Sequence, residues 1–148
     1  MSGLAEYVAV LERLASNMPG LLHPAVERAA DRVRDEATEN LSGRVLQQRS
    51  GDLLETLEVV TISGSSGAGI EATAGSPTVR YAAIHEHGGT IQAAGDGYLH
   101  FLGRYGWARV RQVTIPARPY LRPAMEAGAA ELPGALHDEF FALMKEGR

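Results

Sequence analysis

The sequence contains no cysteine, which excludes disulfide bonds, thiolate chemistry and cysteine-ligated metals. This absence suits a reducing compartment. The N-terminal segment lacks the basic region of a signal peptide, so none is expected. No apolar run approaches the roughly 20 residues of a membrane span. The net charge of the 148 residues is only −4, so the protein as a whole is not expected to bind polyanions generically.

Acidic residues are missing from one long segment, since no Asp or Glu occurs from Gly97 to Met125. Arginine pairs with phosphate and aromatic rings stack on bases, so this segment could contact nucleic acid. The alternative is that its arginines pair with acids of the helices or of a neighbouring subunit. We favour the alternative, because a dedicated nucleic-acid-binding domain usually has a basic isoelectric point. The arginines are Arg104, Arg109, Arg111, Arg118 and Arg122, and the aromatic residues considered for stacking are Tyr98, Tyr105, Trp107 and Tyr120.

Apolar residues recur at helical spacing in the N-terminal part of the chain. They predict a short helix over residues 2–17, a break at Met18-Pro19-Gly20, and a longer helix from about Pro24 to Leu41. Pro24 suits the first turn of a helix, where its missing N–H would be unpaired in any case. Gly43 is expected to close the second helix as a left-handed cap. The apolar stripe of that helix consists of Val26, Ala30, Val33, Ala37 and Leu41.

The next segment predicts a turn and a hairpin. Gly51 can bend the chain, and Asp52 can cap a short helical turn that carries leucines. Residues 58–63 are rich in β-branched residues and predict a strand. A turn at residues 64–67 would lead into a returning strand over residues 68–74.

Residues 79–87 alternate in polarity and predict a strand, with Tyr81, His85 and His87 on one face. After Gly88-Gly89, residues 90–93 extend that strand or start the next. A second hairpin is expected between residues 98–102 and 108–115.

The C-terminal segment, from Leu121 to Lys145, is helical but contains Pro133. A mid-helix proline costs about 3 kcal/mol or more, so we expect a kink, or two helices that meet near Leu132. The order of elements predicts a single α+β domain over residues 1–148. Its sheet would be mostly antiparallel with about four to five strands, flanked by two N-terminal helices and the long, proline-interrupted C-terminal helix.

Two segments organise the predicted structure. Gly88-Gly89 permits positive φ and a close approach of backbones, so the chain can turn sharply after His87. The three prolines between Thr114 and Pro123 fix φ and remove N–H donors. A strand that ends at Ile115 therefore becomes a stiff, extended arm that aims the following helix. Apolar residues of this arm need a partner, either in the same chain or in another.

His85-Glu86-His87, together with His100, suggests a metal site. Two histidines at i and i+2 on a strand share a face and can bind Zn²⁺, and Glu86 could act as a base. However, the spacing departs from the H-E-x-x-H pattern, and Glu86 would point to the opposite face of the strand. We favour the alternative that these polar residues end a strand and border an interface.

Neither a nucleophile elbow nor a phosphate-binding loop occurs in the sequence. The serines lie in or beside glycine-rich turns, without the neighbouring base that a hydrolytic triad requires. The sequence therefore predicts neither an enzyme nor a cofactor.

Four short elements resemble, in order and approximate spacing, the virion-morphogenesis and tail-completion (neck) proteins of tailed bacteriophages. His87 and Tyr120 stand where the family commonly has Phe, and both keep a planar ring. The elements are Arg49-Ser50-Gly51-x-Leu53, Tyr81-Ala82-x-x-His85-x-x-Gly88-Gly89-x-Ile91, Ile115-Pro116-Ala117-Arg118-Pro119-Tyr120-Leu121 and Leu121-Arg122-Pro123-Ala124-Met125.

The resemblance implies a structural virion protein of a phage, prophage or gene-transfer particle, with no active site and no cofactor. Such a protein is assembled in the cytoplasm of the bacterial host. It forms a ring, a hexamer or similar, at the head–tail junction or tail end. The implied partners are other copies of itself, neighbouring neck, connector and tail-tube or terminator proteins, and the DNA that passes through the channel without sequence-specific contact. No membrane is involved.

Under this hypothesis, subunit contacts should lie at the glycine turn and the proline-rich arm. The arginines of the second hairpin should face the DNA channel or an acidic neighbour; they are Arg104, Arg109 and Arg111. Two alternatives stay open: a metal-dependent enzyme that uses His85, His87 and His100, and a small nucleic-acid-binding module. The predicted contact residues are Tyr81, His85, Gly88, Gly89, Pro116, Arg118, Pro119, Tyr120 and Leu121.

Overall fold

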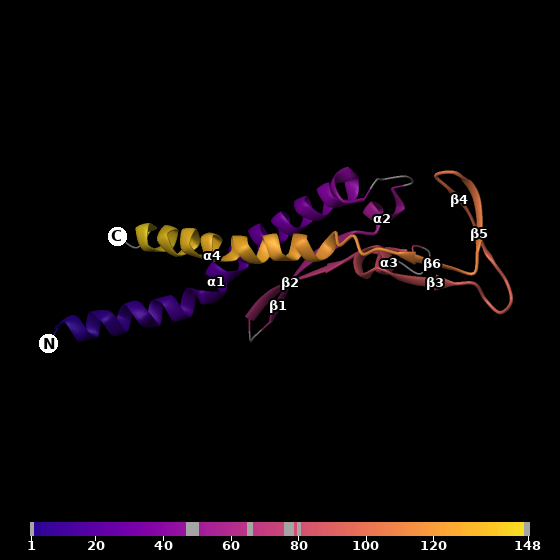
Figure 1. Cartoon of the computed structure of the whole chain (residues 1–148). Helices are drawn as coiled ribbons and strands as arrows, with labels where there is room; N and C mark the ends of the chain where they lie inside the picture. The colour runs from indigo at the N-terminus through magenta and orange to yellow at the C-terminus, as the bar shows by residue number, and fades with distance from the viewer. Residues whose placement is uncertain (1, 47–50, 65–66, 76–78, 80, 147–148) are drawn as a thin grey trace.

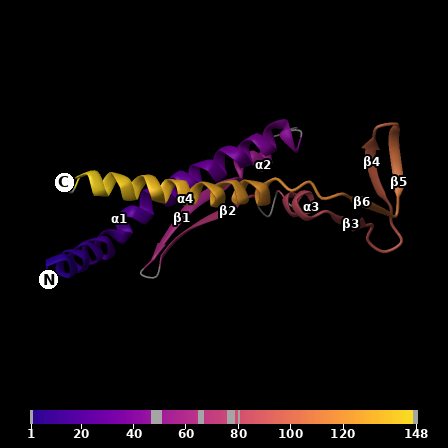
Figure 2. The same ribbon diagram turned by 60° about the vertical axis from the view of Figure 1, so that its left-hand side comes forward.

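The computed structural model describes residues 2–46, 51–64, 67–75, 79 and 81–146. The molecule is elongated, and both termini lie at one end (Figure 1). Two long helices cross in the body, and a β-hairpin stands across the opposite end, as a second view confirms (Figure 2). The mixture of helices and antiparallel strands agrees with the predicted α+β class.

The N-terminal part is one helix rather than two. Helix α1 runs continuously from Ser2 to Glu39 with Pro19 and Pro24 inside it, so the predicted break was wrong. At 1.5 Å per residue, its 38 residues span about 57 Å. Each proline removes one intrahelical hydrogen bond, but Leu21 and Ala25, which flank Pro24, are buried. The gain from this packing outweighs the local preference of the chain for a break.

Helix α1 ends in a wide π-helical turn, η1 (Asn40–Arg44). Gly43 has φ 137°, so a positive-φ glycine ends the helix, as predicted. Gly51 likewise bends the chain with φ 90°, directly before the short helix α2 (Asp52–Glu55).

The strands form three separate two-stranded antiparallel sheets. The prediction of antiparallel pairing is confirmed, but the single sheet of four to five strands was wrong. The second strand of the predicted hairpin at residues 98–115 is interrupted at Arg111, so its halves pair with different partners. The pairs are β1 (Glu58–Gly64) with β2 (Gly67–Thr73), β3 (Gly89–Gln92) with β6 (Gln112–Ile115), and β4 (Leu99–Gly103) with β5 (Gly106–Val110).

Residues 82–87 form a short helix, α3 (Ala82–His87), where a strand was predicted. The amide of Gly88 donates to the carbonyl of Ile84 at 2.8 Å and so completes a helical turn. Two adjacent alanines, the best helix formers, begin the segment. The helix buries Ala82 and leaves His87 exposed, a division that the alternating polarity of the sequence did not reveal.

Helix α4 (Leu121–Glu146) is a single helix that contains Pro133, so the alternative of two helices was wrong. It crosses α1 closely at Gly128, because a Cβ there would lie 2.3 Å from Cγ2 of Val33 and 2.9 Å from the carbonyl oxygen of Ala29. The predicted apolar stripe of α1 is confirmed, since Val26, Ala30, Val33, Ala37 and Leu41 are all buried. On the exposed side of the crossing, Arg28 pairs with Glu131 and Asp138 of α4.

Candidate functional site

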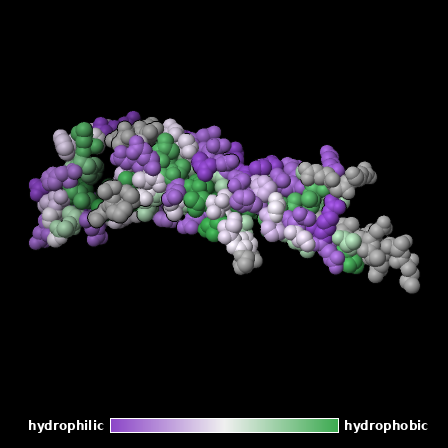
Figure 3. Space-filling model, turned by 180° about the vertical axis from the view of Figure 1, so that it is seen from behind, coloured by the Kyte–Doolittle hydropathy of each residue, from purple (hydrophilic) through white to green (hydrophobic). Residues whose placement is uncertain are grey.

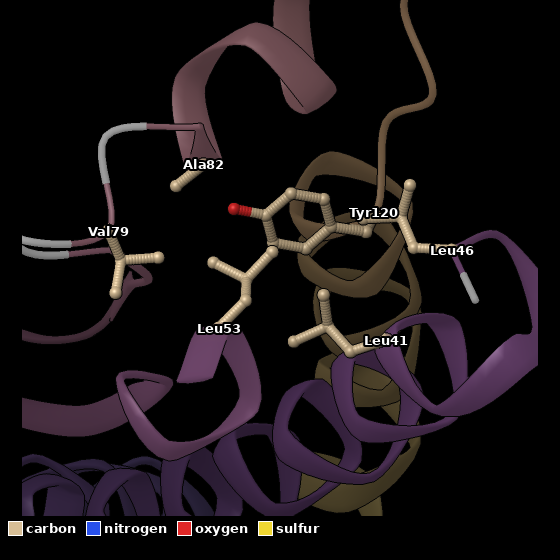
Figure 4. Packing of buried hydrophobic residues seen from close by; sticks show 6 residues of the cluster. All are labelled: Leu41, Leu46, Leu53, Val79, Ala82 and Tyr120. Carbon is tan, nitrogen blue, oxygen red and sulfur yellow. The ribbon is translucent and has the colours of Figure 1, made fainter. Parts of the chain in front are cut away.

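Three of the four sequence elements of the resemblance converge on one buried side chain, Tyr120, whose residue is only 2% exposed. The carbonyl oxygen of Tyr120 accepts a hydrogen bond from Nδ2 of Asn40 at 3.0 Å. Burial, and secondarily the charge of Glu86, raises the pKa of Tyr120 to about 12, so the phenol stays neutral. The residues packed around the ring, shown in Figure 4, are Leu41, Leu46, Leu53, Val79 and Ala82.

The carboxylate of Glu86 caps the N-terminus of α4. Oε2 accepts hydrogen bonds from the amides of Tyr120 (2.8 Å) and Leu121 (2.9 Å), and Oε1 accepts one from Arg122 at 3.0 Å. Amides in the first turn of a helix have no partner within the helix, and they favour negative charge. Burial alone would raise the pKa of Glu86, but the three backbone hydrogen bonds outweigh it, so the pKa lies below its ordinary value.

The arm (Pro116–Tyr120) is also held by direct backbone contact with α3. The amide of Arg118 donates to the carbonyl of His85 at 2.7 Å. Gly88 has φ 69°, and a Cβ there would lie 2.7 Å from the amide nitrogen of Ala117. The prediction that Gly88 allows positive φ and a close approach of two backbones is confirmed. We call α3, Gly88, the arm and the first turn of α4 the joint.

His85 lies inside the joint with a buried Nδ1 that has no hydrogen-bond partner among the described residues. Its ring meets that of Tyr81 edge to face, with centroids 5.8 Å apart. Burial, and then the charge of Arg118, lowers its pKa below the ordinary value. A neutral imidazole packed against a tyrosine is a structural element of the joint.

The strand arrangement on which the metal alternative depended does not form, because residues 82–87 are helical. In a helix, residues two positions apart do not share a face, so the expectation that His85 and His87 face the same way was wrong. Within the described parts of the chain, no three His, Asp or Glu residues lie together in a way that could hold a metal ion.

The predicted contact residues fall into two groups. Tyr81, Gly89, Pro116 and Arg118 remain exposed. Tyr120, in contrast, is enclosed by its own chain, and its ring has no free surface for a partner in this conformation. His85, Gly88, Pro119 and Leu121 are half-buried. The subunit interface itself stays a prediction.

Sequence reasoning missed that Glu86 caps α4 and that Asn40, in η1, binds the carbonyl of Tyr120. One signal could have indicated Glu86: the first turn of α4 contains no acidic residue, and the arm contains no Ser, Thr, Asn or Asp to cap a helix. The cap therefore had to come from elsewhere in the chain. Arg49 and Ser50 of the first sequence element lie outside the described residues.

The β4–β5 hairpin carries the three arginines that were predicted to face DNA or an acidic neighbour. His100 pairs with Arg109 and Leu102 with Trp107, and paired residues of an antiparallel ladder share a face. The guanidinium of Arg109 lies 3.9 Å from the centroid of the Tyr98 ring, and that of Arg111 lies 5.4 Å away. Arg104, Arg109 and Arg111 form no ion pair with any described acid of the chain.

A groove runs between α1 and β1 and is lined by Glu27, Asp31 and Arg34 on one side and Val59 and Thr61 on the other. Arg34 donates to Oδ1 of Asp31 at 2.6 Å and to the carbonyl of Val59 at 3.1 Å. Its guanidinium thus fastens the strand to the helix.

Comparison with known proteins found no family model, no curated protein and no solved structure that matches this chain. Among the described residues, no helix is both long and apolar enough to cross a bilayer.

Proposed function

We propose that this chain is a ring-forming structural subunit of a tailed phage, prophage or gene-transfer particle, located at the head–tail junction or the tail end. The observation that carries the proposal is the joint. Several residues of the resemblance to tail-completion proteins hold the backbone there: His85 accepts a hydrogen bond from the arm, Gly88 touches it, and Tyr120 is buried beside it.

The side chains of the joint that could take part in catalysis hold the backbone in place instead. The carboxylate of Glu86 accepts three backbone hydrogen bonds and has a lowered pKa, which makes it a poor base near neutral pH. The imidazole of His85 is half-buried, and Gly88 touches the backbone of the arm. A joint built from such residues supports a role in architecture rather than in bond making.

The shape of the molecule also supports assembly. Its two ends are built differently, one from helices and the other from a β-hairpin (Figure 1). A ring requires each subunit to offer two different faces to its neighbours, and an elongated chain with unlike ends can supply them.

Contact with DNA is a second candidate role, favoured by the arginines of the β4–β5 hairpin that have no acidic partner among the described residues. Such contact would be with phosphates and would not depend on sequence. Its affinity for duplex DNA should fall steeply as salt is raised. An affinity for duplex DNA that does not change between low and physiological salt would argue against this role.

Electron microscopy of assembled particles tests the main proposal. An in-frame deletion of the gene should yield heads and tails that do not join or complete, and a plasmid copy should restore them. Density for this chain should appear as a ring at the neck or the tail end. Its absence from purified, infectious particles would refute the proposal.

A further inference from the structure

Large apolar side chains are exposed at both ends of the molecule. At the hairpin end, Leu102 is 68%, Trp107 79% and Tyr105 97% exposed. At the helix end, Leu11 is 62% and Phe141 51% exposed. Figure 3 shows hydrophobic colour at the hairpin end, over the middle of the molecule and, in smaller patches, toward the helix end. Large exposed apolar patches on a protein surface mark interaction sites.

The N-terminal half of α1 is the exposed part of the helix end. Among the described side chains of α1, those before Leu21 are all exposed, and Leu21 is the first that is buried. In proteins most of the stability of a helix comes from the packing of its apolar face. The apolar stripe of this segment therefore needs a surface to pack against.

The two ends carry opposite charge. The hairpin end, residues 98–111, has three arginines and no acid, for a net charge of +3. The helix end consists of residues 2–20, with two acids and one arginine, and residues 134–146, with four charged residues of which three are acids. Together they give a net charge of −3. One of these acids, Asp138, is shared with Arg28, which leaves the sign unchanged.

The exposed area agrees with a large contact. The chain exposes 10600 Å², whereas a compact monomer of 15.8 kDa would expose about 7,300 Å². The excess of about 3,300 Å² exceeds the area buried in a standard protein–protein interface, about 1,600 Å². In a head-to-tail assembly each subunit buries area at both of its ends.

We infer that the β4–β5 hairpin of one copy docks on the helix end of the next copy, in a head-to-tail contact between unlike surfaces. The occupant is a second copy because the two ends match in both apolar character and charge. Duplex DNA would satisfy the arginines but leave Leu102 and Trp107 uncovered. The docking itself does not depend on the proposed function; only the closure of the contact into a ring rests on it.

Two variants, each of which lacks one of the two docking surfaces, test this contact in the full-length protein. One variant removes the hairpin surface, Leu102→Ser with Trp107→Ser, and the other removes the helix surface, Leu11→Ser with Phe141→Ser. Sedimentation velocity over a range of concentrations should show oligomers for the native protein. Each variant alone should weaken self-association about 30-fold or more, the loss of a typical hot spot.

The mixture of the two variants gives the diagnostic result. Each retains the surface that the other has lost, so an equimolar mixture should form a 1:1 dimer and nothing larger. Ile62→Ser, which alters a 50% exposed residue of β1, is the matched control and should assemble as the native protein does. A native protein that stays monomeric, or a mixture that forms no dimer, would overturn the inference.

Cysteine cross-linking provides a second readout, with substitutions at two exposed positions of the chain. The chain has no cysteine, so Tyr105→Cys and Met144→Cys introduce the only thiols. The double variant should cross-link into a ladder with a short bismaleimide, while each single variant should stay monomeric. A ladder from Met144→Cys alone would show that helix ends meet each other, and the head-to-tail contact would be wrong.

Other outcomes separate this inference from the proposed function. If the hairpin variant assembles normally but loses binding to a short DNA duplex, the docking inference is wrong and the hairpin contacts DNA instead. If particles contain the chain but neither pair of substitutions alters assembly, the inference fails while the function stands. If the ends dock in solution but the chain is absent from particles, the inference stands while the proposed function fails.

Discussion

The joint and the β4–β5 hairpin use similar residues in opposite ways. In the joint, aromatic and charged side chains are enclosed: Tyr120 is buried, and Glu86 is fully occupied by backbone amides. In the hairpin, Tyr105 and Trp107 are among the most exposed large apolar side chains that the structure describes, and Arg109 stacks on Tyr98. The comparison teaches that the recognisable sequence elements mark where the chain holds itself. The most exposed of the large apolar side chains that the structure describes, Tyr105 and Trp107, lie outside those elements.

The same substitution at two tyrosines should separate the regions most strongly. Tyr120→Ala empties a closed apolar site and should lower the free energy of unfolding by about 4 kcal/mol. Tyr105→Ala removes a ring that is 97% exposed and should change it by less than about 0.5 kcal/mol. Urea unfolding at a concentration where the native protein is monomeric measures both. Equal losses of unfolding free energy for the two variants would contradict the contrast between the enclosed joint and the exposed hairpin.

Two glycines provide the next comparison. Gly88→Ala places a Cβ 2.7 Å from the amide nitrogen of Ala117 at φ 69°, so strain and displacement of the arm should cost about 3 kcal/mol. Gly134 lies in α4, and no heavy atom lies within 4 Å of the position that a Cβ would take there, so Gly134→Ala should be neutral or stabilise by up to about 1 kcal/mol. Thermal unfolding distinguishes them. A harmless Gly88→Ala would mean that the arm does not approach α3 so closely.

The smallest effect concerns the charge of Glu86. Its pKa in the folded chain is below the ordinary 4.5, so the folded state binds its proton less readily than the unfolded state. The resulting stability is fully present above about pH 4.5 and is lost as the pH falls through the folded pKa. The stability difference between the native protein and Glu86→Gln should therefore shrink on acidification, as measured by denaturant unfolding from pH 7 to pH 3. Glu58→Gln, at the exposed first residue of β1, is the matched control for the loss of one carboxylate.

Sequence patterns predicted the features that depend on a few adjacent residues. The positive φ at Gly43, Gly51 and Gly88 follows from the lack of a Cβ. The buried stripe of α1 follows from helical periodicity, and the pairing of β4 with β5 follows from two β-rich segments around a glycine turn. These features depend little on how the rest of the chain is arranged in space.

The errors share one physical cause. Residues 79–87 alternate like a strand, and Pro19 reads as a helix stop, but both interpretations weigh only local preference. In the folded chain, burial of Ala82 in the joint and of Leu21 in the body of the molecule outweighs those preferences, which amount to a few kcal/mol at most. Such burial depends on segments that are distant in sequence.

By itself, the sequence determined where the chain can turn, which helix face is apolar, and where acidic residues are missing. Only the tertiary structure decided that Glu86 caps a helix 35 residues further along, and that the proline-rich arm packs on its own chain. A hydrogen bond forms between groups brought within about 3 Å of each other, and no local pattern records which distant amides a carboxylate will meet.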